Sequence, residues 1–103
     1  GIAPRTLEAQ VVQDADRLDA LGAIGLTRCI AVGAALGRPV YESVDPFCRN
    51  RAPDDRGASV DHFYTKLLKL AGTMQTAAGR REAERRTGFL RDFLAQLESE
   101  IAT

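Results

Sequence analysis

Apolar residues recur every three or four positions along most of this chain, which is the spacing of a helix face. The first such segment follows Pro4, with Thr6 as its predicted N-cap and Glu8 in the first turn, where the helix dipole favours an acid. A second segment ends at Gly37, a residue suited to terminating a helix. The predicted apolar faces are Leu7, Val11, Ala15, Leu18 and Gly22 in the first segment, and Leu26, Cys29, Ile30, Gly33 and Leu36 in the second.

Two glycines predict a break between these segments. Gly22 and Gly25 would each cost about 1 kcal/mol relative to alanine inside a helix, so we expect separate helices near 6–20 and 23–36. Residues 37–57 contain three prolines and predict an irregular loop, long enough to be functional or disordered. We expect this loop to be ordered and docked through its apolar side chains, Tyr41, Val44 and Phe47.

Two further helices complete the predicted fold. Ser59 is expected to cap the third helix, which fades near residues 72–75, and Thr76 to open a fourth that runs to about Ile101. Their apolar stripes are Phe63, Leu67, Leu70 and Met74, widened by Tyr64 and Leu68, and then Phe89, Leu90, Phe93, Leu94, Leu97 and Ile101. The chain therefore predicts an all-α bundle of about four helices, forming one domain over residues 1–103.

Composition narrows the possible functions. Of the 103 residues, 14 are basic and 14 acidic, and this balance argues against a protein that binds nucleic-acid backbones. The run of arginines and glutamates over residues 80–86 has salt-bridge spacing and predicts a solvated, self-paired helix face. There is no run of about 18 apolar residues, so no membrane span is expected. Cys29 and Cys48 are not in a Cys-x-x-Cys pair and no export signal is visible, which predicts reduced thiols and a cytoplasmic location.

Three carboxylates lie within six residues of the first predicted helix. Helix geometry places Asp16 and Asp19 on one side, with Asp14 about 200° away from Asp16. We interpret Asp14 as a surface partner of Arg17. Asp16 shares its face with apolar residues, so it is either a ligand of a hard divalent cation or a surface or capping acid.

The third predicted helix carries a second polar group. His62, Lys66 and Lys69 are spaced to share one face, away from the apolar stripe. Such a face could bind phosphate oxygens, and the alternative is an ordinary solvated surface. His62 is the one histidine of the chain, so no His-Asp doublet is present.

Residues 11–20, Val-Val-Gln-Asp-Ala-Asp-Arg-Leu-Asp-Ala, followed by Gly-Ala-Ile-Gly at 22–25, resemble the last signature of the HD-domain phosphohydrolases. Residues 37–41 and 62–70 are similar to further segments of bacterial metal-dependent HD hydrolases and nucleotide pyrophosphohydrolases. The resemblance covers about Thr6 to Ile101 and matches Asp16 to the last metal-binding aspartate of the family. It implies an all-α domain, manganese or magnesium as the metal, and hydrolysis of a phosphate ester or anhydride, with a phosphorylated small molecule or nucleotide as substrate.

The resemblance also implies which residues face the substrate: His62, Lys66, Lys69, Arg17 and Asp19. The family's earlier His and His-Asp motifs would precede Gly1, so this chain resembles the C-terminal half of such an enzyme. We therefore expect weak metal binding and no hydrolysis by the chain alone, and either a missing N-terminal half or self-association to cover its apolar surface. The alternatives are a stand-alone helical binding module and a degenerate HD-like regulator without catalysis.

Overall fold

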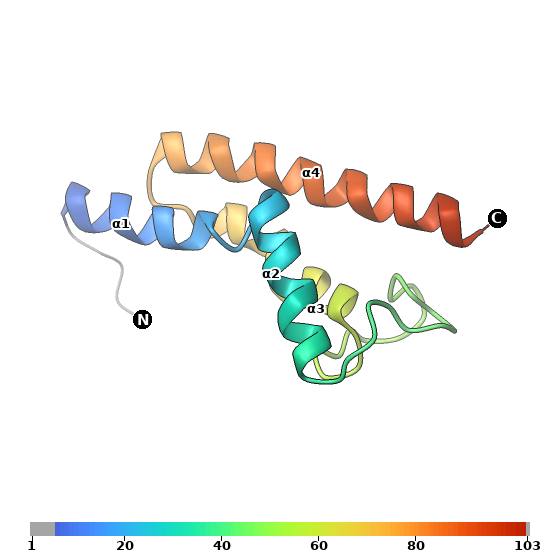
Figure 1. Ribbon diagram of the computed structural model, residues 1–103. Helices are drawn as coiled ribbons and strands as arrows, with labels where there is room; N and C mark the ends of the chain where they lie inside the picture. The colour runs from blue at the N-terminus through green and yellow to red at the C-terminus, as the bar shows by residue number, and fades with distance from the viewer. Residues whose placement is uncertain (1–5, 103) are drawn as a thin grey trace.

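The computed structural model describes residues 6–102, and this range is helical without any strand (Figure 1). Its α-helices are α1 (Leu7–Leu18), α2 (Gly22–Ala35), α3 (Ser59–Thr65) and α4 (Ala77–Ile101), and a 3₁₀ helix, η1 (Leu67–Thr73), joins α3 to α4. The all-α prediction and the break at residues 19–21 are confirmed. The predicted role of Pro4 lies outside the described residues.

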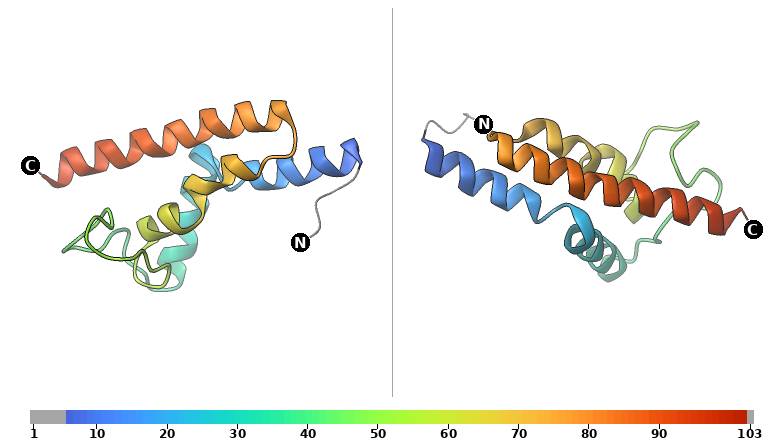
Figure 2. Two further views of the ribbon diagram at one scale, coloured as in Figure 1. Left: turned by 180° about the vertical axis from the view of Figure 1, so that it is seen from behind. Right: turned by 90° about the horizontal axis from the view of Figure 1, so that it is seen from above.

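The long helix α4 runs along one side of the molecule and organises the other elements (Figure 1). Two views show α1 alongside the first half of α4, running in the same direction (Figure 2). Helix α2 turns away from α1 by 58° and packs against both α4 and α3. No single helix in residues 6–102 is long and apolar enough to cross a membrane, although α1 and α2 reach that length and composition together as a bent pair.

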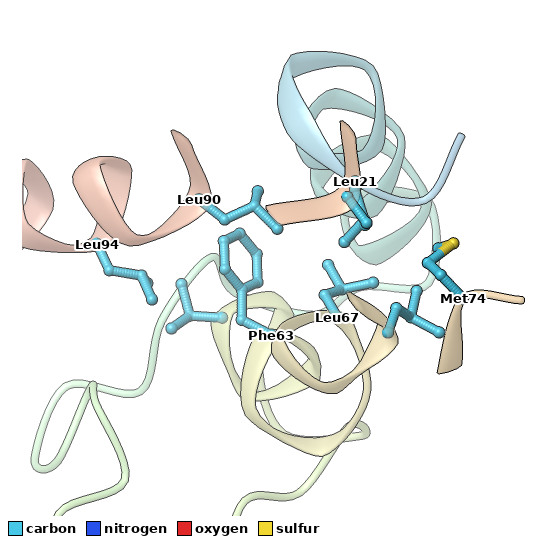
Figure 3. Close-up of a cluster of buried hydrophobic side chains, with 9 residues drawn as sticks. Leu21, Phe63, Leu67, Met74, Leu90 and Leu94 are labelled. Carbon is cyan, nitrogen blue, oxygen red and sulfur yellow. The ribbon is translucent and has the colours of Figure 1, made fainter. Parts of the chain in front are cut away.

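The hydrophobic core lies where α2, α3, η1 and α4 meet. Phe63 is fully buried at its centre, faces Leu90 and Leu94 (Figure 3), and lies with its ring centroid 6.0 Å from that of Phe93. Burial of such a side chain contributes about 1.5–3 kcal/mol. The predicted stripe of the third helix is confirmed, and the middle of the fourth-helix stripe, from Leu90 to Leu97, packs in or against the core. Phe89 and Ile101 are exposed, so their predicted place in that stripe is wrong. Leu21, in the turn between α1 and α2, is also fully buried, although no helical periodicity marked it.

The predicted apolar face of α1 is wrong. Leu7 and Val11 are 70% and 51% exposed, and Leu18 is the member of that face that packs against the core. The reason is that α1 contacts α4 through a different side, which carries Asp14. At the other end of α2, Leu36 is also exposed rather than buried.

Two predicted caps are confirmed and a third is wrong. The side chains of Thr6 and Thr76 accept hydrogen bonds from the N–H groups of Ala9 and Gly79, at 3.1 and 2.9 Å. Ser59 is already the first residue of α3 and provides no side-chain cap. Backbone carbonyls of the preceding loop take the place of a side-chain cap at the start of α3. The N–H groups of Ser59 and Val60 donate to the carbonyl oxygens of residues 39 and 40 at 3.0 and 2.8 Å.

The loop between α2 and α3 is anchored to Asp61 of α3. Both oxygens of Asp61 accept hydrogen bonds from the guanidinium of Arg51, at 2.5 and 3.0 Å. Burial alone would raise the pKa of Asp61, but Arg51 and the N–H of Asp54 hold it below its ordinary value. Tyr41 and Phe47 pack against the core as predicted, whereas Val44 is 88% exposed and the predicted docking of this residue is wrong.

Candidate functional site

Asp14 is buried, which corrects its predicted place on the surface. Its side chain is 2% exposed and accepts hydrogen bonds from the N–H of Gln75 at 2.8 Å and from the N–H and hydroxyl of Thr76 at 2.9 and 2.7 Å. Burial would raise the pKa of Asp14, but these hydrogen bonds outweigh burial and lower it. Arg17, its predicted partner, donates to the carbonyl of Thr73 at 2.7 Å. Asp14 therefore holds α1 against the start of α4.

Asp16 lies on the open side of the same helix. It is exposed, and within residues 6–102 its carboxylate forms no hydrogen bond or ion pair. Val12, one turn earlier, is 68% exposed, so the apolar surroundings predicted for Asp16 are open to solvent. Asp19 is exposed as well and caps the C-terminus of α1. Asp16 is thus free to take a ligand from outside the described residues.

A cavity of about 410 Å³ lies between α2, the end of the loop and α3. We call it the arginine cavity, because Arg28, Arg38 and Arg56 line it. Its volume is within the range of small-molecule sites. Ala20, which also lines it, follows Asp16 by four residues and lies beyond the end of α1, in the turn before α2.

The charge of the arginine cavity is positive. None of its three guanidinium groups forms a hydrogen bond or ion pair within the part of the chain that the structure describes. Elsewhere, by contrast, Arg51 pairs with Asp61, and Glu82 pairs with arginines of its own helix as the sequence predicted. Among the described residues that line the cavity, Asp55 supplies the one carboxylate. The arrangement suits an anion with several oxygens.

Asp55 holds His62 at the edge of this cavity. The Nδ1 atom of His62 lies 3.2 Å from Oδ2 of Asp55, and the other carboxylate oxygen accepts the hydroxyl of Thr65. The hydrogen bond from Thr65, with help from His62, lowers the pKa of Asp55. An ionised Asp55 favours a proton on Nδ1 of His62, which leaves Nε2 as the nitrogen for other partners.

The structure does not place Lys66 and Lys69 with His62 at the cavity. The α-helix ends at Thr65 and the backbone of Lys66 has φ −137° and ψ −57°, so the three residues do not share the face that a continuous helix would give them. Both lysines are exposed, and neither lines the arginine cavity. The predicted common face is wrong, while their contact with substrate stays a prediction.

Sequence reasoning missed the arginines of the cavity and Asp55. Arg28 carried a signal, because it is an isolated charge within the apolar stretch from Leu18 to Leu36. Arg38, Asp55 and Arg56 lie in the irregular segment, whose path through space no periodicity predicts. Their convergence with Arg28 depends on how the loop returns to α2.

No protein-family model matches the chain. It is 38% identical over 98 residues to the protein YpgQ of Bacillus subtilis, a match that covers 95% of this chain and 42% of the relative. A solved HD-superfamily hydrolase from Bacillus thuringiensis is 45% identical, with a TM-score of 0.78, over 92% of this chain and 46% of that one. The crystal structure of B. subtilis YpgQ in complex with ADP gives 38% identity and a TM-score of 0.77, over 94% and 45% of the two chains.

These similarities have two consequences. The described chain has an all-helical fold like that of an HD-superfamily hydrolase. It also spans less than half the length of the relatives it matches.

Proposed function

We propose that this chain is the C-terminal part of a metal-dependent phosphohydrolase of the HD type, which acts on phosphate esters or anhydrides of nucleotides. The observation that carries the proposal is Asp16, an exposed carboxylate without a partner in residues 6–102, four residues before Ala20 of the arginine cavity. The similarity to an HD-superfamily hydrolase supports the reaction class. The complex of a relative with ADP supports a nucleotide as the substrate class.

The residues described here do not form a complete metal centre. Manganese and magnesium take several ligands, mostly oxygens, and no group of three or more His, Cys, Asp or Glu side chains in residues 6–102 could hold an ion. Asp16 would supply one ligand, and the others would come from residues outside this range. We therefore expect weak metal affinity and no turnover from the 103-residue chain alone, and we derive no catalytic step through the ion.

The shape of the molecule supports a further polypeptide segment against α1 and α2. Its radius of gyration is 14.8 Å, compared with about 13 Å for a compact domain of this length. Val12 and Ile24 are large apolar side chains left exposed on these helices. A missing N-terminal half that carries the remaining metal ligands would cover this surface and face Asp16.

The same exposed surface favours a second candidate, a helical interaction module without catalysis. In that case α1 and α2 bind a separate partner chain or a second copy, and Asp16 is an ordinary surface acid. The two candidates differ in what Asp16 does, so its substitution separates them.

The test uses the full-length product of the gene and measures hydrolysis of nucleoside triphosphates with manganese. Asp16→Asn should lower turnover by at least about 100-fold, because substitutions of residues that merely support metal ligands already cost about 10–100-fold. Its manganese affinity, measured by calorimetry, should fall as well. The matched control is Asp92→Asn, the same change at an exposed position of α4.

Normal turnover and manganese affinity in the Asp16→Asn variant would refute the proposed role of this residue. Robust metal-dependent hydrolysis by the 103-residue chain alone would contradict the partial site. A full-length product that hydrolyses no nucleotide but forms a stable complex through α1 and α2 would favour the interaction module.

A further inference from the structure

We propose that the arginine cavity binds the phosphate chain of its ligand through Arg28, Arg38 and Arg56, with His62 as a further donor. Only the identity of that ligand as the substrate rests on the proposed function. The binding of phosphate groups follows from the charge and geometry of the cavity as the described residues line it.

The three arginines reach the cavity from different parts of the chain. Arg28 is in α2, Arg38 follows that helix, and Arg56 precedes α3. Three like charges around one cavity repel one another unless an anion lies between them. A guanidinium offers planar, bidentate donors that match phosphate oxygens. In residues 6–102 no carboxylate forms a hydrogen bond or a close ion pair with these three groups, although the charge of Arg38 acts on Asp55, so their donors remain available to a ligand.

His62 adds a fourth donor whose orientation is fixed. Because Nδ1 is directed to Asp55 at 3.2 Å, Nε2 is the nitrogen that can donate to a phosphate oxygen when the ring carries both protons. Thr65 holds Asp55 from its other oxygen. Asp55 is therefore a positioning residue, which acts on the ligand through His62.

Apart from Ser59 and Cys29, the remainder of the wall is apolar and fits the organic part of a phosphorylated ligand. Val32 and Leu67 contribute side chains, and Gly25 and Gly33 contribute bare backbone. A volume of about 410 Å³ has room for more than an inorganic ion. Lys66 and Lys69 do not line this wall, so the arginines, and not these lysines, would bind the phosphates.

The experiment measures binding of inorganic pyrophosphate, and of ADP beside it, to the full-length gene product by calorimetry with EDTA present. Arg28→Gln, Arg38→Gln and Arg56→Gln should each weaken pyrophosphate binding about tenfold, because a hydrogen-bonded ion pair is lost. ADP should bind more tightly than pyrophosphate, since it also reaches the apolar wall. The charge-matched control is Arg91→Gln, at an exposed position of α4, which should change affinity less than twofold.

A second set of variants tests the positioning role of Asp55. His62→Gln should weaken pyrophosphate binding, and Asp55→Asn should weaken it by a similar factor. The double variant should bind no more weakly than His62→Gln alone, because Asp55 acts through the histidine. Additive losses in the double variant would contradict this role.

Normal binding by all three cavity variants, or an equal loss in Arg91→Gln, would overturn the proposal. A loss confined to Lys66→Gln and Lys69→Gln would overturn it too, because the phosphates would then lie at the lysines. EDTA removes divalent metal ions, so this binding test does not depend on the metal site of the proposed function. The Asp16→Asn variant should therefore still bind pyrophosphate. Cavity-dependent binding without any hydrolysis would leave this inference standing and the phosphohydrolase proposal refuted.

Discussion

The Asp14 carboxylate accepts hydrogen bonds from both the N–H and the hydroxyl of Thr76, a residue 62 positions later in the chain. The same hydroxyl oxygen accepts the N–H of Gly79 and caps α4. A Cβ atom on Gly79 would lie 2.3 Å from Oδ2 of Asp14, so the two helices meet without space for a side chain there. This link fixes the turn of α1 that carries Asp16, two residues after Asp14.

Replacing Asp14 should therefore destabilise the protein, while replacing Asp16 should not. We expect Asp14→Asn to lower the free energy of unfolding by about 2 kcal/mol, because an amide nitrogen would face the N–H donors of α4. Asp16→Asn, the matched control two residues away, should change it by less than about 0.5 kcal/mol, since Asp16 is exposed. Urea unfolding of both variants checks this, and equal effects would contradict the distinct roles assigned to them.

Stability should also fall in acid because of Asp61. The pKa of this buried carboxyl is lowered in the folded protein, so the folded state favours its ionised form. A lowered pKa contributes stability that is present above the unfolded value near 4 and is lost as pH falls through the folded pKa. Thermal unfolding from pH 7 to pH 2.5 should show this loss below about pH 4. Asp61→Asn should be less stable at pH 7 and show a shallower acid dependence, and an unchanged slope would contradict this role of Asp61.

The features that the sequence predicted correctly are set by residues close to one another along the chain. The stripe from Phe63 to Met74 repeats at helical spacing, and Thr6 and Thr76 bond to N–H groups three residues later. The break between α1 and α2 follows from glycine, whose conformational freedom is a local property. Gly22 has φ +68°, a conformation that other residues rarely adopt.

The features that the sequence missed depend on residues far apart in the chain. Helix geometry alone placed Asp14 outward, because its partners at Gln75 and Thr76 belong to another element. The cavity arginines converge only after the loop folds back on α2. The change from α to 3₁₀ geometry at Lys66, just before the segment η1 that packs on α4, is likewise indicated by no local spacing. Asp16 as a metal ligand stays a prediction, since its expected co-ligands lie outside residues 6–102.

The turn between α1 and α2 requires glycine at position 25. A Cβ atom there would lie 2.1 and 2.2 Å from the carbonyl carbon and oxygen of Ala20, which belong to backbone and cannot rotate away. Gly25→Ala should therefore destabilise the protein by several kcal/mol, on the order of a severe core change. Gly88→Ala is the matched control in α4, where a Cβ meets nothing within 4 Å, and it should stabilise by about 0.5–1 kcal/mol. Thermal unfolding measures the stability of both variants. A change of stability in the same direction in both would contradict this account.

The reactivity of Cys48 should report on the anchoring of the loop. Burial, followed by the nearby charge of Asp61, raises the pKa of Cys48 to about 11, so roughly one thiol in a thousand is ionised at pH 8. Iodoacetamide should therefore modify Cys48 slowly in the folded protein and rapidly in urea. Arg51→Gln removes the partner of Asp61 and should release this part of the loop, which speeds alkylation of Cys48.

Cys29 serves as the internal control for this measurement. Its pKa is also raised by burial, but its thiol donates to the carbonyl of Ser59 and is not bonded to the Arg51 pair. Arg49→Gln is the matched substitution, because Arg49 pairs with Glu98 at an exposed position where ion pairs contribute little. Mass spectrometry should find that only the Arg51→Gln variant is modified faster than the unaltered protein, and that only its Cys48 reacts faster. Equal acceleration at both thiols would mean that the whole fold has loosened, and it would contradict a local anchor between Arg51 and Asp61.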